Sequence, residues 1–234
     1  MGRPRLSRSR AGSRKSARPE GPATNKEMRE ASLSDIEESA IACFLENGVR
    51  STSVEQIAAR AGLTKGGFYF HFPKKDLLIS HIIKRIQTDY IEQSINVASR
   101  TGSAKDRLIS MMHQQVIFAR DHRREVALLV LMSLEFRDDS EIGDQLRGVY
   151  DKVRSFVRAV FLDGQKSGEF TNSVSSEALA HFYVAVHDGF LMELVRSGDT
   201  IDGPELVRAY RESLLRGILA GGRNERLPAS GQSG

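Results

Sequence analysis

The chain has 234 residues, of which 40% are hydrophobic and 27% are charged, and this composition is ordinary for a globular protein. No apolar run approaches the ~20 residues that a membrane-spanning helix needs, and no Cys/His cluster has the spacing of a zinc site. The single cysteine, Cys43, excludes an intrachain disulfide and fits a reducing compartment. We therefore expect a cytoplasmic protein with no membrane span, no metal and no cofactor.

The N-terminal segment is strongly basic. Residues 1–20 contain seven Arg or Lys and one acidic residue, whereas the whole chain has a net charge of only +4, so the rest of the chain is net acidic. The segment lacks the hydrophobic stretch of a secretory signal. We predict that residues 1–32 form a disordered basic arm. Such an arm either contacts DNA phosphates or a minor groove, or only solubilises the chain; the sequence leaves both open.

The first predicted helix begins at Ser34, where Glu37 three residues later completes a capping box. It ends near Asn47, because Gly48 follows. Its apolar residues recur at helical spacing and define an inward face: Ile36, Ala40, Ile41, Phe44 and Leu45.

Two shorter helices follow within residues 53–72. Ser53 and Gln56 form a second capping box, and Gly62 is the residue type that ends a helix with a positive φ. Thr64 is the N-cap of the next helix, which extends from Lys65 to Phe72. Phe68 and Phe72, four residues apart, are expected to face inward. Two short helices joined by a tight turn are typical of a helix-turn-helix, whose second helix lies in the DNA major groove.

The run LTKGGFYFHFPKKDLL makes this pattern more specific. It closely resembles the signature of the TetR family of bacterial regulators, and the resemblance extends over about residues 34–80. The shared pattern is an N-cap, small residues, an apolar residue, Tyr, any residue, His, Phe and then Lys–acid–Leu. The resemblance implies a sequence-specific DNA-binding transcriptional regulator, in the first instance a repressor released from a palindromic operator by a small-molecule effector. The alternative is a DNA-binding activator or chromosome-organising protein without such an effector.

The residues expected to contact double-stranded DNA lie at both helix starts and along the second helix. The N-caps direct backbone N–H groups at phosphates, the lysine that opens the second helix can donate to a guanine edge, and two glycines allow close approach of the backbone. Tyr69, His71 and Lys75 resemble the family's phosphate-contacting positions, although His71 could instead be a buried core residue. The full set is Ser53, Thr64, Lys65, Gly66, Gly67, Tyr69, His71 and Lys75.

The rest of the chain is also predicted to be helical. Pro73 stops the short helix, and a long helix from Lys74 to about Ser99 leads into a second domain. Its further helices are expected at residues 104–122, 126–136, 139–164, 175–196 and 204–220. The fold class is therefore all-α, with a DNA-binding head at residues 33–80, a helical effector-binding and dimerisation domain at residues 81–221, and a disordered tail at residues 222–234.

The second domain is expected to bind the effector and a second copy of the chain, as the family resemblance implies. The last two helices carry broad apolar faces that suit a homodimer, although a monomeric core would look similar. Aromatic residues, methionine and histidine could line a cavity for an apolar or aromatic effector, although most belong equally well to an ordinary core. The candidates are Met112, Phe136, Tyr150, Phe182, His187 and Phe190. No nucleophile motif or Gly-rich phosphate loop is present, so we expect no enzyme activity.

Overall fold

The computed structural model describes residues 25–137, 140–197 and 203–219. In these ranges the structure is helical apart from turns and one isolated bridge. The head and the helix that leaves it comprise α1 (Asn25–Asn47), α2 (Val54–Arg60), α3 (Lys65–His71) and α4 (Lys75–Ile86). The body comprises η1 (Gln87–Glu92), α5 (Gln93–Ser99), α6 (Ala104–Asp121), α7 (Arg123–Glu135), α8 (Ser140–Ser167), α9 (Ser176–Ser197) and α10 (Gly203–Ile218).

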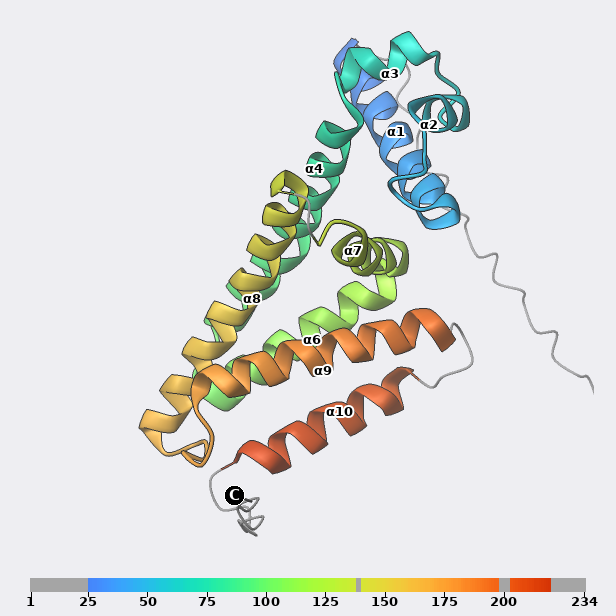
Figure 1. Ribbon diagram of the computed structural model, residues 1–234. Helices are drawn as coiled ribbons and strands as arrows, with labels where there is room; N and C mark the ends of the chain where they lie inside the picture. The colour runs from blue at the N-terminus through green and yellow to red at the C-terminus, as the bar shows by residue number, and fades with distance from the viewer. Residues whose placement is uncertain (1–24, 138–139, 198–202, 220–234) are drawn as a thin grey trace, which may run out of the picture.

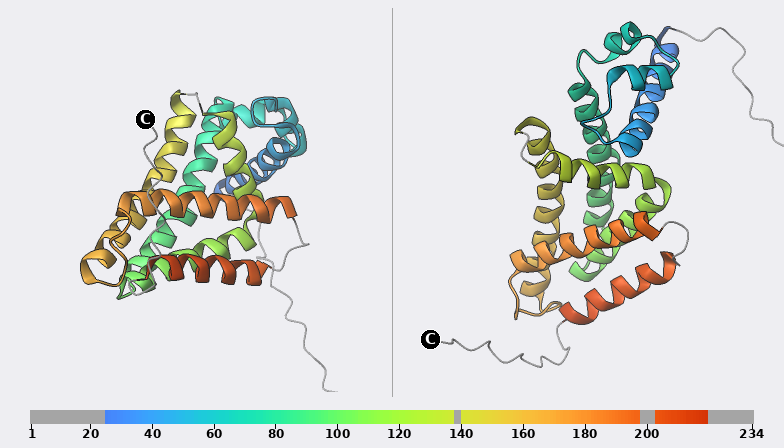
Figure 2. Two further views of the ribbon diagram at one scale, coloured as in Figure 1. Left: turned by 60° about the horizontal axis from the view of Figure 1, so that its bottom comes forward. Right: turned by 45° about the vertical axis from the view of Figure 1, so that its right-hand side comes forward.

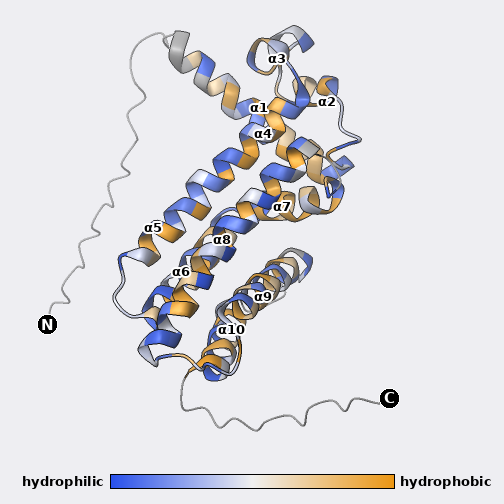
Figure 3. Ribbon diagram, turned by 60° about the vertical axis from the view of Figure 1, so that its left-hand side comes forward, coloured by the Kyte–Doolittle hydropathy of each residue, from blue (hydrophilic) through white to orange (hydrophobic). Residues whose placement is uncertain are grey.

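The two parts are joined by the long helix that begins at α4. Figure 1 shows the head at one end of this helix, with α8 running beside it and α6, α7, α9 and α10 packed across its other half. Hydrophobic residues gather where α1, α2 and α4 meet and along α7, as Figure 3 shows. No helix in the described ranges is long and apolar enough to cross a membrane.

The first helix starts earlier than the sequence predicts. Helix α1 begins at Asn25 and not at Ser34, so residues 25–32, predicted to be disordered, are helical. The segment contains Lys, Glu, Met, Arg and Ala, which favour helix without needing a core, and its Met28 is 51% exposed. The Ser34–Glu37 pair therefore lies inside a helix and caps nothing. Residues 1–24, the tail at 222–234 and Asp139 lie outside the described residues.

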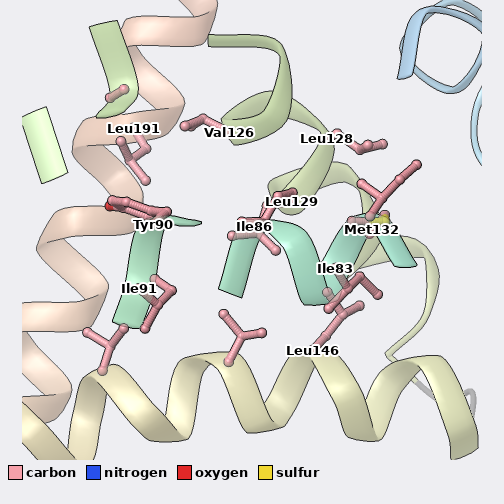
Figure 4. Close-up of a cluster of buried hydrophobic side chains, with 14 of the residues drawn as sticks. Ile83, Ile86, Tyr90, Ile91, Val126, Leu128, Leu129, Met132, Leu146 and Leu191 are labelled. Carbon is pink, nitrogen blue, oxygen red and sulfur yellow. The ribbon is translucent and has the colours of Figure 1, made fainter. Parts of the chain in front are cut away.

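The predicted helix from Lys74 to Ser99 is present, but its middle is wound differently. Residues 87–92 form a π-helix between α4 and α5, a local winding with i→i+5 bonds that hydrophobic spacing does not reveal. Before it, Ile83 and Ile86 are buried between α7 and α8, where Figure 4 shows Leu129 on one side and Leu146 on the other. The helix thus belongs to the cores of both domains.

Helix α8 is fixed at its C-terminal end by close packing against the segment that follows it. It continues through Gly164, which was expected to end it, and stops at Ser167 before Gly168, whose φ is +80°. The buried Phe170 ring lies over Gly164, and a Cβ atom there would be only 2.2 Å from Cδ2 of this ring. Next to it, Thr171 N–H donates to the carbonyl of Ile218 over 2.8 Å, which holds the end of α10 in place.

We predict that Gly164→Ala lowers the free energy of unfolding by about 1–3 kcal/mol, because the added methyl must displace a buried ring. Gly148→Ala in the same helix is the matched control, since a Cβ there meets nothing within 4 Å; it should stabilise the protein by about 0.5–1 kcal/mol through helix propensity. Urea unfolding of both variants measures these changes. Equal stability of Gly164→Ala and the natural protein would contradict the packing described.

Candidate nucleic-acid interface and buried cavity

The two helices of the helix-turn-helix begin as predicted, and α3 ends at His71, one residue before the predicted Phe72. Ser53 Oγ accepts from Gln56 N–H (3.2 Å) while Gln56 Oε1 accepts from Ser53 N–H (2.7 Å). Gly62 follows α2 with φ +68°. Thr64 Oγ1 accepts from Gly67 N–H over 3.0 Å and caps α3. Local hydrogen bonds therefore set where both helices start, and the sequence identifies them correctly.

Helix α3 has an inner and an outer face. Phe68 and Phe72 are buried, with ring centroids 6.0 Å apart, and belong to the core of the head. On the outer face, Tyr69 is 42% exposed and Phe70 is 70% exposed. An aromatic side chain this exposed on a helix that is itself well packed points to a surface that contacts something else.

The outer face also carries a charged pair. Lys65 forms an ion pair with Glu55 of α2, and its ammonium lies 5.9 Å from the centroid of the Tyr69 ring. The hydrogen bond between the two charged groups raises the pKa of Lys65 and lowers the pKa of Glu55. Both side chains are more than half exposed, so the pair is weak and Lys65 can exchange its carboxylate partner for an acceptor on DNA.

Gly66 and Gly67 are not required by the packing of the protein. Both lie in the helical part of α3 and neither has a positive φ. A Cβ at Gly66 would have Thr64 Oγ1 at 3.7 Å as its nearest neighbour, and one at Gly67 would meet Leu63 Cβ at 3.5 Å; both are ordinary contacts. At the exposed Gly66 the room that is left lies on the outside of the helix, whereas at the partly buried Gly67 it faces Leu63.

Lys75 has an intramolecular role that the sequence does not predict. Its ammonium donates to the carbonyls of Val49 (2.9 Å), Arg50 (3.1 Å) and Thr52 (2.8 Å), which uses all three of its donors. Partial burial lowers the pKa of Lys75. His71 is half-buried, with its ring in edge contact with the Phe70 ring at 5.4 Å. The phosphate contacts predicted for these two residues stay predictions, and that of Lys75 would have to compete with three bonds already made.

A small cavity of about 30 Å³ lies in the body beside the π-helix, with room for a water molecule. Tyr90 of η1 lines it and stacks on Phe118 of α6, with ring centroids 3.9 Å apart. The walls come from η1, α6, α7, α8 and α9, so five elements meet at this point.

Several polar groups face one another around this cavity. The Tyr90 hydroxyl is 3.3 Å from Nε2 of His187, whose pKa burial lowers to about 4, so the ring is neutral at pH 7. Burial raises the pKa of the neighbouring Asp188 to about 6. Gln115 accepts from the Tyr183 hydroxyl over 2.6 Å, while its buried side-chain nitrogen has no hydrogen-bond partner among the described residues. These groups can recognise a polar part of a bound molecule.

The six candidate effector residues do not come together at one place. Tyr150 and His187 line the cavity, whereas Phe182 and Phe190 line a separate groove between α9 and α10. Met112 is buried in the body without lining the cavity. Sequence reasoning missed most of the cavity wall, including its polar residues Tyr90 and Gln115, because nothing in helical periodicity distinguishes a cavity wall from an ordinary core.

Phe136 lies elsewhere, at the junction with the head. Its ring is 4.6 Å from the guanidinium carbon of Arg50, in the loop between α1 and α2. The residue is 5% exposed and takes part in a contact between the domains. Phe136 therefore does not line the cavity beside Tyr90, and the prediction that it contacts the effector is not supported by this position.

The groove between α9 and α10 is the larger hollow, about 870 Å³ in volume and open to one side. Figure 2 shows the two helices running side by side at the edge of the body. Phe182, which lines the groove, is 53% exposed. Apolar side chains dominate the lining, notably Leu179, Val186, Leu206 and Leu214.

Three histidines of the body, His113, His181 and His187, do not form a cluster. His113 and His181 are exposed, and only His187 is buried. No group of three or more His, Cys, Asp or Glu side chains in the described ranges is placed to hold a metal ion.

Comparison with known proteins agrees with this architecture. Residues 36–82 match the family described as bacterial regulatory proteins, tetR family, and residues 104–219 match the C-terminal domain of BetI-type transcriptional repressors. Together the two matches cover the head and almost the whole body. The chain belongs to the TetR family. It is therefore a DNA-binding transcriptional regulator of this family.

Individual relatives are distant but similar over most of their length. The TetR-family repressor BepR of Brucella suis biovar 1 (strain 1330) is 29% identical over 176 residues, which cover 71% of this chain and 80% of BepR. The crystal structure of the MbdR regulator from Azoarcus sp. CIB has a TM-score of 0.73 and 29% identity, covering 80% of this chain and 99% of MbdR. The structure of AibR in complex with isovaleryl coenzyme A and operator DNA shares the fold, with a TM-score of 0.66 at 17% identity, covering 79% of this chain and 98% of AibR.

We predict that Asp188→Asn stabilises the protein at pH 7.5 but not at pH 3.5. The carboxyl has a pKa of about 6 against an ordinary value of 3.8, so ionising it in the folded state costs free energy that accumulates between these values and is constant above them. Asparagine removes this cost, a gain of about 1–3 kcal/mol at the higher pH. Thermal unfolding at the two pH values measures it, and an equal effect at both would contradict the assignment.

Proposed function

We propose that the protein is a homodimeric repressor that binds a palindromic operator through two copies of α3 and is released by a small apolar or aromatic molecule. The observation that carries the DNA-binding part is the outer face of α3, where Lys65, Gly66 and Tyr69 are exposed on a helix whose inner face is packed into the head. Backbone N–H groups at the capped starts of α2 and α3 supply phosphate contacts. Lys65 and the glycine backbone approach base edges.

We propose that the groove between α9 and α10 is covered by the same groove of a second subunit. One short recognition helix cannot supply operator-level affinity, and a two-fold dimer presents two of them about 34–36 Å apart or a multiple of that spacing. Apolar hollows of this size on a monomer are typical of interfaces. The resulting contact is a four-helix arrangement built from α9 and α10 of both subunits.

We propose that the effector enters at the cavity beside Tyr90 and His187. At about 30 Å³ it is too small for a metabolite, so binding must separate the helices around it. A ligand that binds only the separated state shifts the equilibrium towards it, whereas one with equal affinity for both states would shift nothing. AibR has been crystallised with both a coenzyme A thioester and operator DNA, which illustrates that this fold can accommodate both kinds of ligand.

The direct experiment is selection of bound duplexes from random DNA with the purified chain, followed by a screen of metabolites for release. The proposal predicts a palindromic consensus and release by at least one apolar or aromatic compound. A consensus that no compound releases would favour the alternative of an activator or chromosome-organising protein. Absence of any preferred duplex would contradict the proposal as a whole.

We predict that Gly66→Ala stabilises the protein and weakens its binding to the selected duplex. Alanine is about 1 kcal/mol better than glycine inside a helix, and its Cβ meets no tight contact within the protein, but it fills space that the DNA backbone or a base edge needs. Thermal unfolding and fluorescence anisotropy with a labelled duplex measure the two effects, with at least a tenfold loss of affinity expected. Unchanged affinity would remove α3 from the interface at this position.

We predict that Phe182→Glu converts the dimer into a folded monomer, because it places a charge in the centre of the apolar groove. Leu134→Glu is the control, since Leu134 is 71% exposed on α7 and does not line the groove. Sedimentation velocity reports the oligomeric state of both variants. A monomeric natural protein, or a Phe182→Glu dimer as stable as that of the control, would contradict the proposed interface.

A further inference from the structure

The loop between α1 and α2, residues 48–53, is bound to the end of α7 in the body. The two carboxylate oxygens of Glu135 accept separate hydrogen bonds from backbone amides of this loop, one from Val49 N–H (3.1 Å) and one from Arg50 N–H (2.9 Å). In the other direction, Arg50 Nε–H donates to the carbonyl of Glu135 over 3.0 Å. The Arg50 guanidinium then lies over the Phe136 ring. Figure 1 shows how the end of α1 approaches α7 at this point.

The same loop is held on its other side by α4. Its amide groups face Glu135, while its carbonyls at Val49, Arg50 and Thr52 accept from the Lys75 ammonium. An anion on the amides and a cation on the carbonyls satisfy both kinds of backbone group in one turn, and charge-assisted hydrogen bonds are the stronger kind. Val49 and Thr52 are buried, so their backbone groups have little access to water as a substitute.

The loop has little freedom within the head itself. The Thr52 hydroxyl donates a shared hydrogen bond to two carbonyls, those of Cys43 in α1 (3.1 Å) and of Gly48 at the start of the loop (2.8 Å). Gly48 has φ +85°, and a Cβ there would lie 3.2 Å from a carboxylate oxygen of Glu135. Ser53, the last loop residue, caps α2, and α2 is followed by α3 after the turn at Gly62. A displacement of the loop therefore moves both helices of the DNA-binding motif.

We propose that Glu135 is a positioning residue for operator binding: it docks the loop at residues 48–53 onto the end of α7 and so fixes the angle at which α3 is presented to DNA. It does not touch DNA itself, because it lies on the body side of the head. Its removal should leave the head folded, since the core around Phe68 and Phe72 does not depend on it, but should let the head take several orientations. Two heads that must fit two half-sites at once are sensitive to such freedom.

The test compares Glu135→Ala and Glu135→Gln with Val126→Ala, all in the full-length chain. Val126 is a buried residue of the same helix, so its truncation destabilises α7 packing without touching the loop. Hydrogen exchange measured by NMR reports on the amides of Val49 and Arg50, and anisotropy reports the affinity for the duplex selected from random DNA.

In Glu135→Ala both amides should exchange at least tenfold faster, and operator affinity should fall about tenfold, the equivalent of about 1.4 kcal/mol. Glu135→Gln keeps one acceptor and should lie between this variant and the natural protein. Val126→Ala should lower the melting temperature but change neither the two amides nor the affinity. Unchanged affinity in Glu135→Ala with both amides released, or an equal loss of affinity in Val126→Ala, would overturn the positioning role.

Discussion

The burial of one apolar stripe along α4 is the constraint on which the rest of the structure depends. Leu78, Ile79, Ile82, Ile83 and Ile86 are all at most 2% exposed, and each contributes about 1.5–3 kcal/mol when fully removed from water. Leu78, at the start of this stripe, belongs to the head. Ile83 and Ile86, at its end, lie between α7 and α8 in the body. Because close-packed cores do not deform continuously, the head and the helix must move together when the body changes.

Ion pairs also join α4 to the head and to the body. Glu37 of α1 pairs with Arg85 (2.7 Å) and His81 (2.6 Å) of α4, and Arg85 also reaches Glu125 of α7. Helix α7 carries Leu129 in the cavity wall and Glu135 at the head. These two residues are six positions apart, which is about 9 Å along the helix. The cavity, α7, α4 and the loop at residues 48–53 therefore form a continuous series of contacts from the body to the DNA-binding motif.

The sequence was sufficient where structure is determined locally. The caps at Ser53 and Thr64 and the positive φ of Gly62 depend on residues within one turn, and all three were predicted from the sequence. The inward face of α3 followed from the spacing of two phenylalanines. The start of α1 was missed for the opposite reason: no apolar period marks residues 25–32 in the sequence, although their helix propensity is high.

Features that depend on distant partners could not be predicted in this way. The hydrogen bonds of Lys75 to the loop at residues 48–53 could not be predicted, because the accepting carbonyls lie more than twenty residues earlier in the sequence. Phe136 was predicted to line the effector cavity, because the sequence does not reveal that the Arg50 guanidinium lies over its ring. Likewise, Phe182 and His187 are five residues apart in one helix, yet Phe182 lines the groove beside α10 and His187 lines the small cavity in the body, because α9 is covered by different neighbours on its two sides.

The most direct test of the account is to replace single residues with a photoreactive amino acid and irradiate the complex with the selected duplex. Phe70, on the outer face of α3, and Leu134, on α7, are equally exposed, at 70% and 71%. The account predicts efficient crosslinking to DNA from position 70 and none from position 134. Crosslinking from position 134 without any from position 70 would contradict the claim that α3 is the part of this protein that meets DNA.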